Sequence, residues 1–217
     1  MSKKVQNIES FVYSQLLELK ADLKLWSTLY KIDPRTLSAI LLVERQQYNL
    51  KDARSALKRA VGSICDFIDN HPRQSGDKWV DLPTWVNNSR GFARIKYETA
   101  KRVMMLQPTT ACPITPHDLV QYRTTPALAI KIAACILRIH LDQWSTLAGP
   151  LSLEVLATLY NISDFINKQP HSKPQPGGSI LPAIIDGQYI EGLNFGERVL
   201  RVYNSEEMAR FIKKLWL

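Results

Sequence analysis

Residues 37–49, LSAILLVERQQYN, place one glutamate at the end of an apolar run. Asp33 and Pro34 precede this run and are typical of a helix start, because aspartate caps helices and proline is tolerated in the first turn. We expect a helix from Pro34 to about Gln46. Residues three or four apart share a helix face, and the face of Glu44 also carries Leu37, Ile40 and Leu41. The pattern therefore predicts that Glu44 points inward or into the wall of a cleft.

A carboxyl group on such a face has two interpretations. Burial in apolar surroundings raises the pKa of a carboxyl group, so that it stays protonated near neutral pH and can donate a proton. Cleavage of a glycosidic bond needs such a proton at the leaving oxygen. Alternatively, a glutamate near a helix end turns out to solvent or pairs with a lysine, as charged residues commonly do. The segment around Glu44 alone leaves both interpretations open.

Helical patterns continue along nearly the whole chain. We expect an N-terminal helix over residues 5–30, a second amphipathic helix over 51–69 and a C-terminal helix over 206–216. Further helices are expected at 97–106, 116–122, 126–147, 153–165 and 195–203. The stretches 70–92 and 169–192 are predicted to be loops, the second with room for a short hairpin. Asn204 and Glu207 have the spacing of a capping box. The sequence predicts a single, mainly α domain with loop-rich insertions.

The composition is that of an ordinary globular protein, with 45% hydrophobic and 22% charged residues. The net charge of +8 favours a polyanionic partner such as nucleic acid, an acidic membrane face or an acidic wall polymer. A solvated basic surface without a partner fits the charge as well. Three cysteines without CxxC spacing and four scattered histidines form no ligand pattern, so no metal or cofactor is predicted. Buried thiols are expected at Cys65 and Cys135, and one disulfide is left open.

The N-terminal segment, residues 1–20, has neither the apolar core nor the cleavage site of a signal peptide. No run of about 18 apolar residues is present, so we expect no membrane span. We therefore expect synthesis in the cytoplasm without a classical signal peptide. An extracytoplasmic target would need non-classical delivery.

Five segments, in order, resemble the lysozyme-like soluble lytic transglycosylases and the related goose-type lysozymes. The helix that carries the catalytic glutamate in that family is similar to residues 37–49, with Glu44 as the acid. The other four segments are GFARIKYETA (91–100), AIKIAACIL (129–137), LATLYNIS (156–163) and FGERVLRVY (195–203). Together they cover about residues 34–203. The resemblance implies a lysozyme-like helical domain that cleaves the glycan strands of peptidoglycan.

The resemblance also implies roles for three residues. Glu44 would protonate the oxygen between N-acetylmuramic acid and N-acetylglucosamine. It would then act as a base while the substrate's own 6-hydroxyl attacks and forms a 1,6-anhydro end. Tyr160 would orient Glu44, and Asn161 would stiffen the cleft. Ordinary packing at a helix end is the alternative for Tyr160 and Asn161.

Aromatic residues are expected to contact the glycan. Trp79, Trp85 and Tyr97 flank the predicted loop beside the cleft, and flat aromatic faces stack on sugar rings. Tyr48, which follows soon after Glu44 in the sequence, is also expected to bind the substrate, as are Arg94, Tyr160 and Asn161. Alternatively, the two tryptophans anchor a long loop to the core.

Several positions depart from the family pattern. Arg94 stands where the family has glutamine, and it could bind a carboxylate of the peptide stem or pair with Glu44. Pairing would favour the charged carboxylate and oppose an acid role. Hydrolysis with inversion would need a second carboxylate across the cleft. The candidates for it, none marked by spacing, are Asp66, Asp69, Asp77 and Asp81. The single-glutamate mechanism is therefore preferred.

The sequence thus predicts a peptidoglycan lytic transglycosylase of the secreted-effector or phage-endolysin type, acting in the periplasm or cell wall. A hydrolytic muramidase and a non-catalytic wall-binding relative are the alternatives. A more distant alternative is a basic helical protein that binds nucleic acid through Lys51, Arg54, Lys58 and Arg59. No recognition motif accompanies these four residues, which form a basic stripe on the predicted helix, so no nucleic-acid partner is expected. Besides glycan strands, an acidic immunity protein or inhibitor is a candidate partner.

Overall fold

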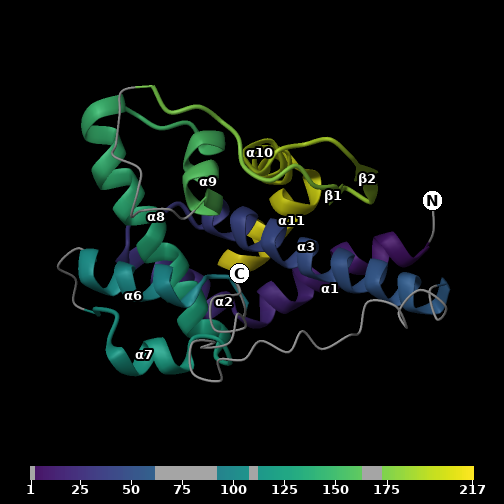
Figure 1. Ribbon diagram of the computed structural model, residues 1–217, viewed down its shortest axis with the longest axis horizontal. Coiled ribbons are helices and arrows are strands. Elements are labelled where there is room, and N and C mark those ends of the chain that lie inside the picture. The colour runs from purple at the N-terminus through teal and green to yellow at the C-terminus, as the bar shows by residue number, and fades with distance from the viewer. Residues whose placement is uncertain (1–2, 62–91, 108–111, 163–172) are drawn as a thin grey trace, which may run out of the picture.

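The computed structural model describes residues 3–61, 92–107, 112–162 and 173–217, and of 3–7 and 48–61 the backbone only (Figure 1). Within these ranges the protein is mainly helical, with nine helices and one two-stranded sheet. The predicted mainly α class is confirmed. No helix of the described ranges is long and apolar enough to cross a lipid bilayer.

The N-terminal segment forms two helices, α1 (Lys3–Glu18) and α2 (Lys20–Leu29), so the prediction of one helix over residues 5–30 is wrong. The break lies at Leu19, whose N–H donates to the carbonyl of Leu16 in a tighter turn than that of an α-helix. The break lets the two helices bury separate apolar sets, Val12 and Leu16 from α1 and Leu23 and Trp26 from α2.

The next helix, α3 (Pro34–Val61), begins where predicted but does not end near Gln46. Asp33 caps it as expected, since its carboxylate accepts a hydrogen bond from the Thr36 N–H at 2.9 Å. The predicted second helix over 51–69 is the continuation of α3 at least as far as Val61. The physical reason is that residues 47–51 contain neither glycine nor proline, so nothing interrupts the helix.

The middle of the chain follows the predicted order. Four helices occupy this part: α6 (Tyr97–Leu106), α7 (Pro116–Gln121), α8 (Pro126–Ala148) and α9 (Leu153–Ile162). Thr115 and Asp118 form a capping box at the start of α7, and the Ser152 hydroxyl accepts from the Val155 N–H at the start of α9. The predicted starts of these helices are confirmed, while the predicted end of α9 at residue 165 lies outside the described residues.

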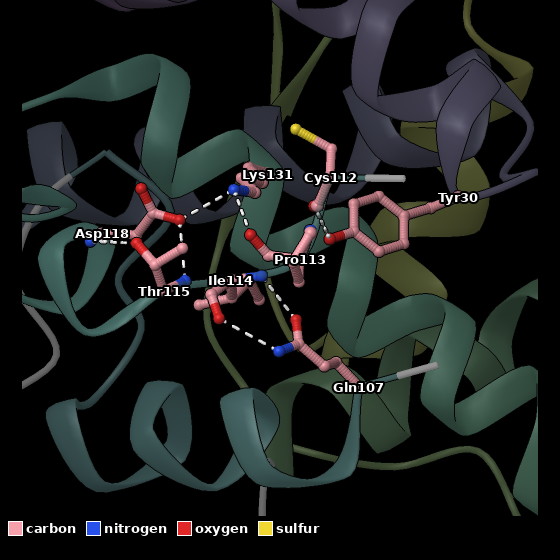
Figure 2. A network of polar contacts seen from close by, with 8 residues as sticks. All are labelled: Tyr30, Gln107, Cys112, Pro113, Ile114, Thr115, Asp118 and Lys131. Atoms are coloured by element: carbon pink, nitrogen blue, oxygen red, sulfur yellow. Dashed lines mark hydrogen bonds and ion pairs between the residues drawn. The ribbon is translucent and has the colours of Figure 1, made fainter. Parts of the chain in front are cut away.

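A buried ion pair fixes the connection that leads into α7 (Figure 2). Lys131 of α8 donates to Asp118 at 2.7 Å and to the Pro113 carbonyl at 2.8 Å. Gln107 adds a pair of hydrogen bonds to the backbone of Ile114. Burial raises the pKa of Asp118, but hydrogen bonds from Lys131 and the Thr115 backbone outweigh it and hold the pKa below its usual value. The network therefore stabilises the fold at neutral pH.

The predicted loop at 169–192 contains a hairpin in which β1 (Ala183–Ile185) pairs antiparallel with β2 (Gln188–Ile190). Asp186 and Gly187 form the turn with φ values of 50° and 74°, the left-handed conformation that such turns require. The carboxylate of Glu9 in α1 accepts hydrogen bonds from both of their N–H groups, at 3.0 and 2.7 Å. Gln46 of α3 exchanges two hydrogen bonds with the Ile184 backbone. The hairpin is thus fixed to two helices.

Two helices close the chain, α10 (Phe195–Asn204) and α11 (Glu206–Trp216). The predicted capping box of Asn204 and Glu207 is wrong. Asn194 and Glu197 form a box of that spacing at the start of α10, and Ser205 caps α11. Asn204 is still the last residue of α10, so the serine after it occupies the capping position.

The helix α3 runs through the middle of the molecule, with α1, α10 and α11 packed against it (Figure 1). The close approach of α10 to α9 depends on Gly196. A Cβ atom at this position would lie 2.5 Å from the Glu154 carbonyl oxygen and 2.8 Å from the Thr158 hydroxyl oxygen. This packing brings α3, α9 and α10 together in the region of the Glu44 carboxylate of α3.

Candidate functional site

Glu44 lies on the inner face of α3, and only 6% of its surface is exposed. The prediction that its side chain points inward is confirmed, and the alternative of a solvent-exposed glutamate is wrong. Its neighbours Ile40 and Leu41 on the same face are fully buried. A carboxylate in such a position needs polar partners, because a buried charge without them is strongly destabilising.

Arg94 supplies one partner. Its Nη1 atom lies 3.4 Å from Oε2 of Glu44 and donates to Oε1 of Gln47 at 2.9 Å. The sequence left two roles for Arg94, binding a carboxylate of the peptide stem and pairing with Glu44. The structure shows the pairing with Glu44. Arg94 has a φ of 52°, a left-handed conformation that costs a non-glycine residue about 1 kcal/mol or more. Contacts around the turn at 92–94 must therefore hold it in place.

Tyr160 of α9 makes one of those contacts. Its hydroxyl donates to the Ala93 carbonyl at 3.0 Å, and the side chain is buried. Burial raises the pKa of Tyr160 well above its usual value, and the nearby Glu44 charge raises it further while Arg94 opposes this. The hydrogen bond of Tyr160 thus supports the turn that carries Arg94, and its predicted role in orienting Glu44 stays a prediction.

Arg198 of α10 is a site residue that the sequence reasoning missed. It is fully buried and donates to the Ser179 carbonyl at 2.7 Å, to the Ser179 hydroxyl at 3.1 Å and to the Asn194 carbonyl at 3.3 Å. Burial lowers the pKa of Arg198 to about 10, while Glu44 raises it and Arg94 lowers it. The sequence did contain a signal that Arg198 is buried, because it shares a helix face with the apolar residues Phe195, Val199 and Val202.

Asn161 is connected to this group indirectly. Its Oδ1 atom accepts a hydrogen bond from the Ser179 N–H at 3.2 Å. It also fills the space beside Gly178, where an added Cβ atom would lie 2.9 Å away from it. Asn161 therefore shapes the 177–179 segment, and Ser179 in that segment contacts Arg198. Its predicted role in stiffening a substrate cleft stays a prediction.

Other predicted site residues fall outside the described part of the structure. The backbone of Tyr48 belongs to α3, but its side chain is not described. Trp85 and Trp79 lie wholly outside the described residues, as do the candidate second carboxylates. The side chains of the basic stripe on α3 are likewise outside them. Tyr97 begins α6 and lies beside Arg123, whose guanidinium is 5.7 Å from the ring centre.

The chemistry of the site follows from its charges. One carboxylate, Glu44, lies near two guanidinium groups, Arg94 and Arg198, which gives the group a formal net charge of +1. The cations favour the ionised form of Glu44, whereas apolar burial favours the neutral form.

In the described residues no cluster of three histidine, cysteine or acidic side chains could hold a metal ion. There, Cys112 and Cys135 are free thiols, and Cys135 is buried as expected.

Comparisons of the chain with protein-family models, with curated proteins and with solved structures find no match. The function of the site must therefore be inferred from the chemistry of its own residues.

Proposed function

We propose that this protein has a lysozyme-like fold and cleaves peptidoglycan glycan strands as a lytic transglycosylase, with Glu44 as the single acid and base. One observation carries the proposal: residues that are far apart in the chain come together around the buried Glu44. Arg94 pairs with it at 3.4 Å, and Tyr160 supports the turn that carries Arg94 through its hydrogen bond to the Ala93 carbonyl. Both belong to segments that resemble family motifs.

In the proposed reaction, protonated Glu44 donates its proton to the oxygen between N-acetylmuramic acid and N-acetylglucosamine. The bond from that oxygen to C1 of the muramoyl ring breaks, and the leaving sugar departs with a new hydroxyl group. The 6-hydroxyl of the same muramoyl ring then attacks C1 and returns its proton to the Glu44 carboxylate. A 1,6-anhydro ring forms, and no water is consumed.

The substrate sets the place of action. Peptidoglycan lies in the periplasm or cell wall, so the proposal places the action of the protein there, as an injected effector or a phage endolysin would act. The net charge of +8 suits attraction to an anionic wall polymer. An effector of this kind would need an acidic inhibitor in the cell that makes it.

A non-catalytic wall-binding protein is the second candidate function. The ion pair between Arg94 and Glu44 favours it specifically, because an ionised carboxylate has no proton to give. This candidate predicts that the protein binds sacculi and releases nothing from them.

Release of soluble fragments from purified sacculi tests the proposal. We expect the unaltered protein to release sugar and Glu44→Gln to release none, because glutamine cannot donate a proton. Glu191→Gln is the matched control, since it removes an exposed carboxylate and should leave release unchanged. Sedimentation of protein with sacculi measures binding in parallel. Binding without release by every variant would replace the enzyme proposal with the binding-only one.

A further inference from the structure

Two buried hydrogen-bond donors in the region of Glu44 have no acceptor in the described part of the chain. They are Nε2 of Gln47 and Nη1 of Arg198, and neither atom has a partner among the described residues. Gln47 is 4% exposed and Arg198 is fully buried. A buried donor left unpaired is costly, so such groups normally have a partner, an ordered water or a ligand.

One donor adjoins the ion pair, and the other belongs to a guanidinium within range of its charges. The Oε1 atom of Gln47 accepts from Arg94 at 2.9 Å, so the unpaired Nε2 atom of that amide lies beside the Arg94 guanidinium. Arg198 is close enough to Glu44 and Arg94 for both charges to act on it. The group is therefore rich in donors, and its two cations exceed its single anion.

The exposed side of the group belongs to Arg94. Its side chain is 17% exposed, against 7% for Glu44. A ligand that approaches from solvent would therefore meet a guanidinium first, and guanidinium groups bind carboxylates with two parallel hydrogen bonds. A single carboxylate would also neutralise the net charge of +1.

We propose that Arg94, Gln47 and Arg198 form a subsite for a carboxylate of the muramoyl unit next to Glu44. This inference rests on the proposed function and names the substrate feature that the site selects. Two carboxylates have this chemistry: the lactyl group of a muramoyl residue without its peptide stem, and an acidic group within the stem. An unsubstituted N-acetylglucosamine unit offers neither.

The subsite would also explain how an ion-paired Glu44 comes to act as an acid. A substrate carboxylate bound to Arg94 competes with Glu44 for the guanidinium. It also adds a negative charge beside Glu44, and both effects favour the protonated form. The proton comes from solvent and later moves to the glycosidic oxygen. The chemistry would therefore begin only when a carboxylate-bearing strand is bound.

Binding of three small probes to the full-length protein tests the subsite without any cleavage. The probes are N-acetylmuramic acid with a free lactyl carboxylate, N-acetylmuramoyl-L-alanyl-D-isoglutamine with a stem carboxylate, and N-acetylglucosamine with none. Calorimetric or NMR titration should give tighter binding for one of the first two, and the tighter one identifies the source. Equal affinity for all three would overturn the proposal and leave an internal water as the partner of the unpaired donors.

Gln47→Glu is the most informative variant, because it is nearly isosteric and replaces the unpaired donor with a negative oxygen. We expect it to weaken binding of the preferred probe on the order of tenfold or more, since it removes a charge-assisted hydrogen bond and adds repulsion. Gln121→Glu adds an identical charge at an exposed position on α7 and should leave binding unchanged. An unaltered affinity in Gln47→Glu would contradict the subsite. If that variant does not fold, the probe comparison still decides.

The subsite and the proposed function can fail separately. Release of sugar from sacculi combined with equal probe affinities would retain the enzyme and reject the subsite. Carboxylate-dependent probe binding without any release would retain the subsite and reject the enzyme.

Discussion

The ion pair between Arg94 and Glu44 can be tested by replacing the arginine with glutamine, the residue of the family pattern. Arg94→Gln removes the positive charge and leaves Glu44 buried on α3 with the more distant Arg198 as its neighbouring cation. We expect the variant to be less stable at neutral pH, because removing one partner of a buried ion pair takes away part of what compensates the remaining charge.

The size of the effect can be worked from the geometry. Two unit charges 3.4 Å apart attract by about 5 kcal/mol at an effective dielectric constant of about 20. The Arg94 side chain is 17% exposed, so water screens part of this attraction. We therefore expect a coupling energy of about 2–4 kcal/mol, above that of exposed pairs and near the lower range for buried ones.

A double-mutant cycle isolates this energy. The free energy of unfolding is measured by urea denaturation for the unaltered protein, Arg94→Gln, Glu44→Gln and the double variant. The coupling should be full at neutral pH and should fall at acidic pH, where Glu44 takes up a proton. The exposed pair of Arg138 and Asp142 is the control, and its cycle should give about 0.2–1 kcal/mol. A coupling at the Glu44 pair no larger than this control would refute the electrostatic account of the site.

Three further predictions concern the fold. Gly196→Ala should lower the free energy of unfolding by about 1–3 kcal/mol, because its Cβ atom would meet the backbone of α9 at 2.5 Å; a melting temperature equal to that of the unaltered protein would contradict this packing. Burial lowers the pKa of His140 to about 3, so the stability it contributes is full above about pH 6.5 and is lost as pH falls toward 3. His140→Gln should therefore flatten the pH dependence of the free energy of unfolding between about pH 6.5 and 4.5, which urea unfolding at several pH values would show. Lys131→Met should cost about 3–5 kcal/mol, and adding Asp118→Asn should recover part of it, as thermal or urea unfolding would show.

Local signals in the sequence were sufficient for most helix starts. Asp33 caps the helix that it was expected to cap. The helices predicted from residues 116 and 153 begin there, with Thr115 and Ser152 as their caps. These predictions succeed because a cap is a contact between residues three apart, which the sequence contains in full. The predicted capping box at Asn204 was wrong because two adjacent residues, Asn204 and Ser205, can both cap a helix. The local sequence does not decide between them, and in the structure Ser205 caps α11.

Helix ends and breaks were harder to predict. The continuation of α3 past Gln46 and the break at Leu19 carry no glycine or proline signal. The helix α3 continues because residues 47–51 contain nothing that interrupts a helix. Tertiary packing decides the break, since it lets α1 and α2 bury separate apolar faces. Such effects depend on neighbours far apart in the chain and are not visible in a local pattern.

The candidate site shows the same division. The burial of Glu44 followed from the helical period of residues 37–44, whereas the role of Arg198 did not. An arginine on an apolar helix face is a signal, but its proximity to Glu44 depends on how α10 packs on α3 and α9. The ion pair of Arg94 with Glu44 depends on the left-handed turn at 92–94, for which the residues of that segment give no signal.

The mass of the glycan ends released from sacculi is the most direct test of the central claim. Attack by the muramoyl 6-hydroxyl should give anhydro ends, which are lighter by one water than the ends produced by hydrolysis, and Glu44→Gln should abolish them. Reducing ends in place of anhydro ends would contradict the single-glutamate mechanism. Undiminished release by Glu44→Gln would contradict the role of Glu44 itself.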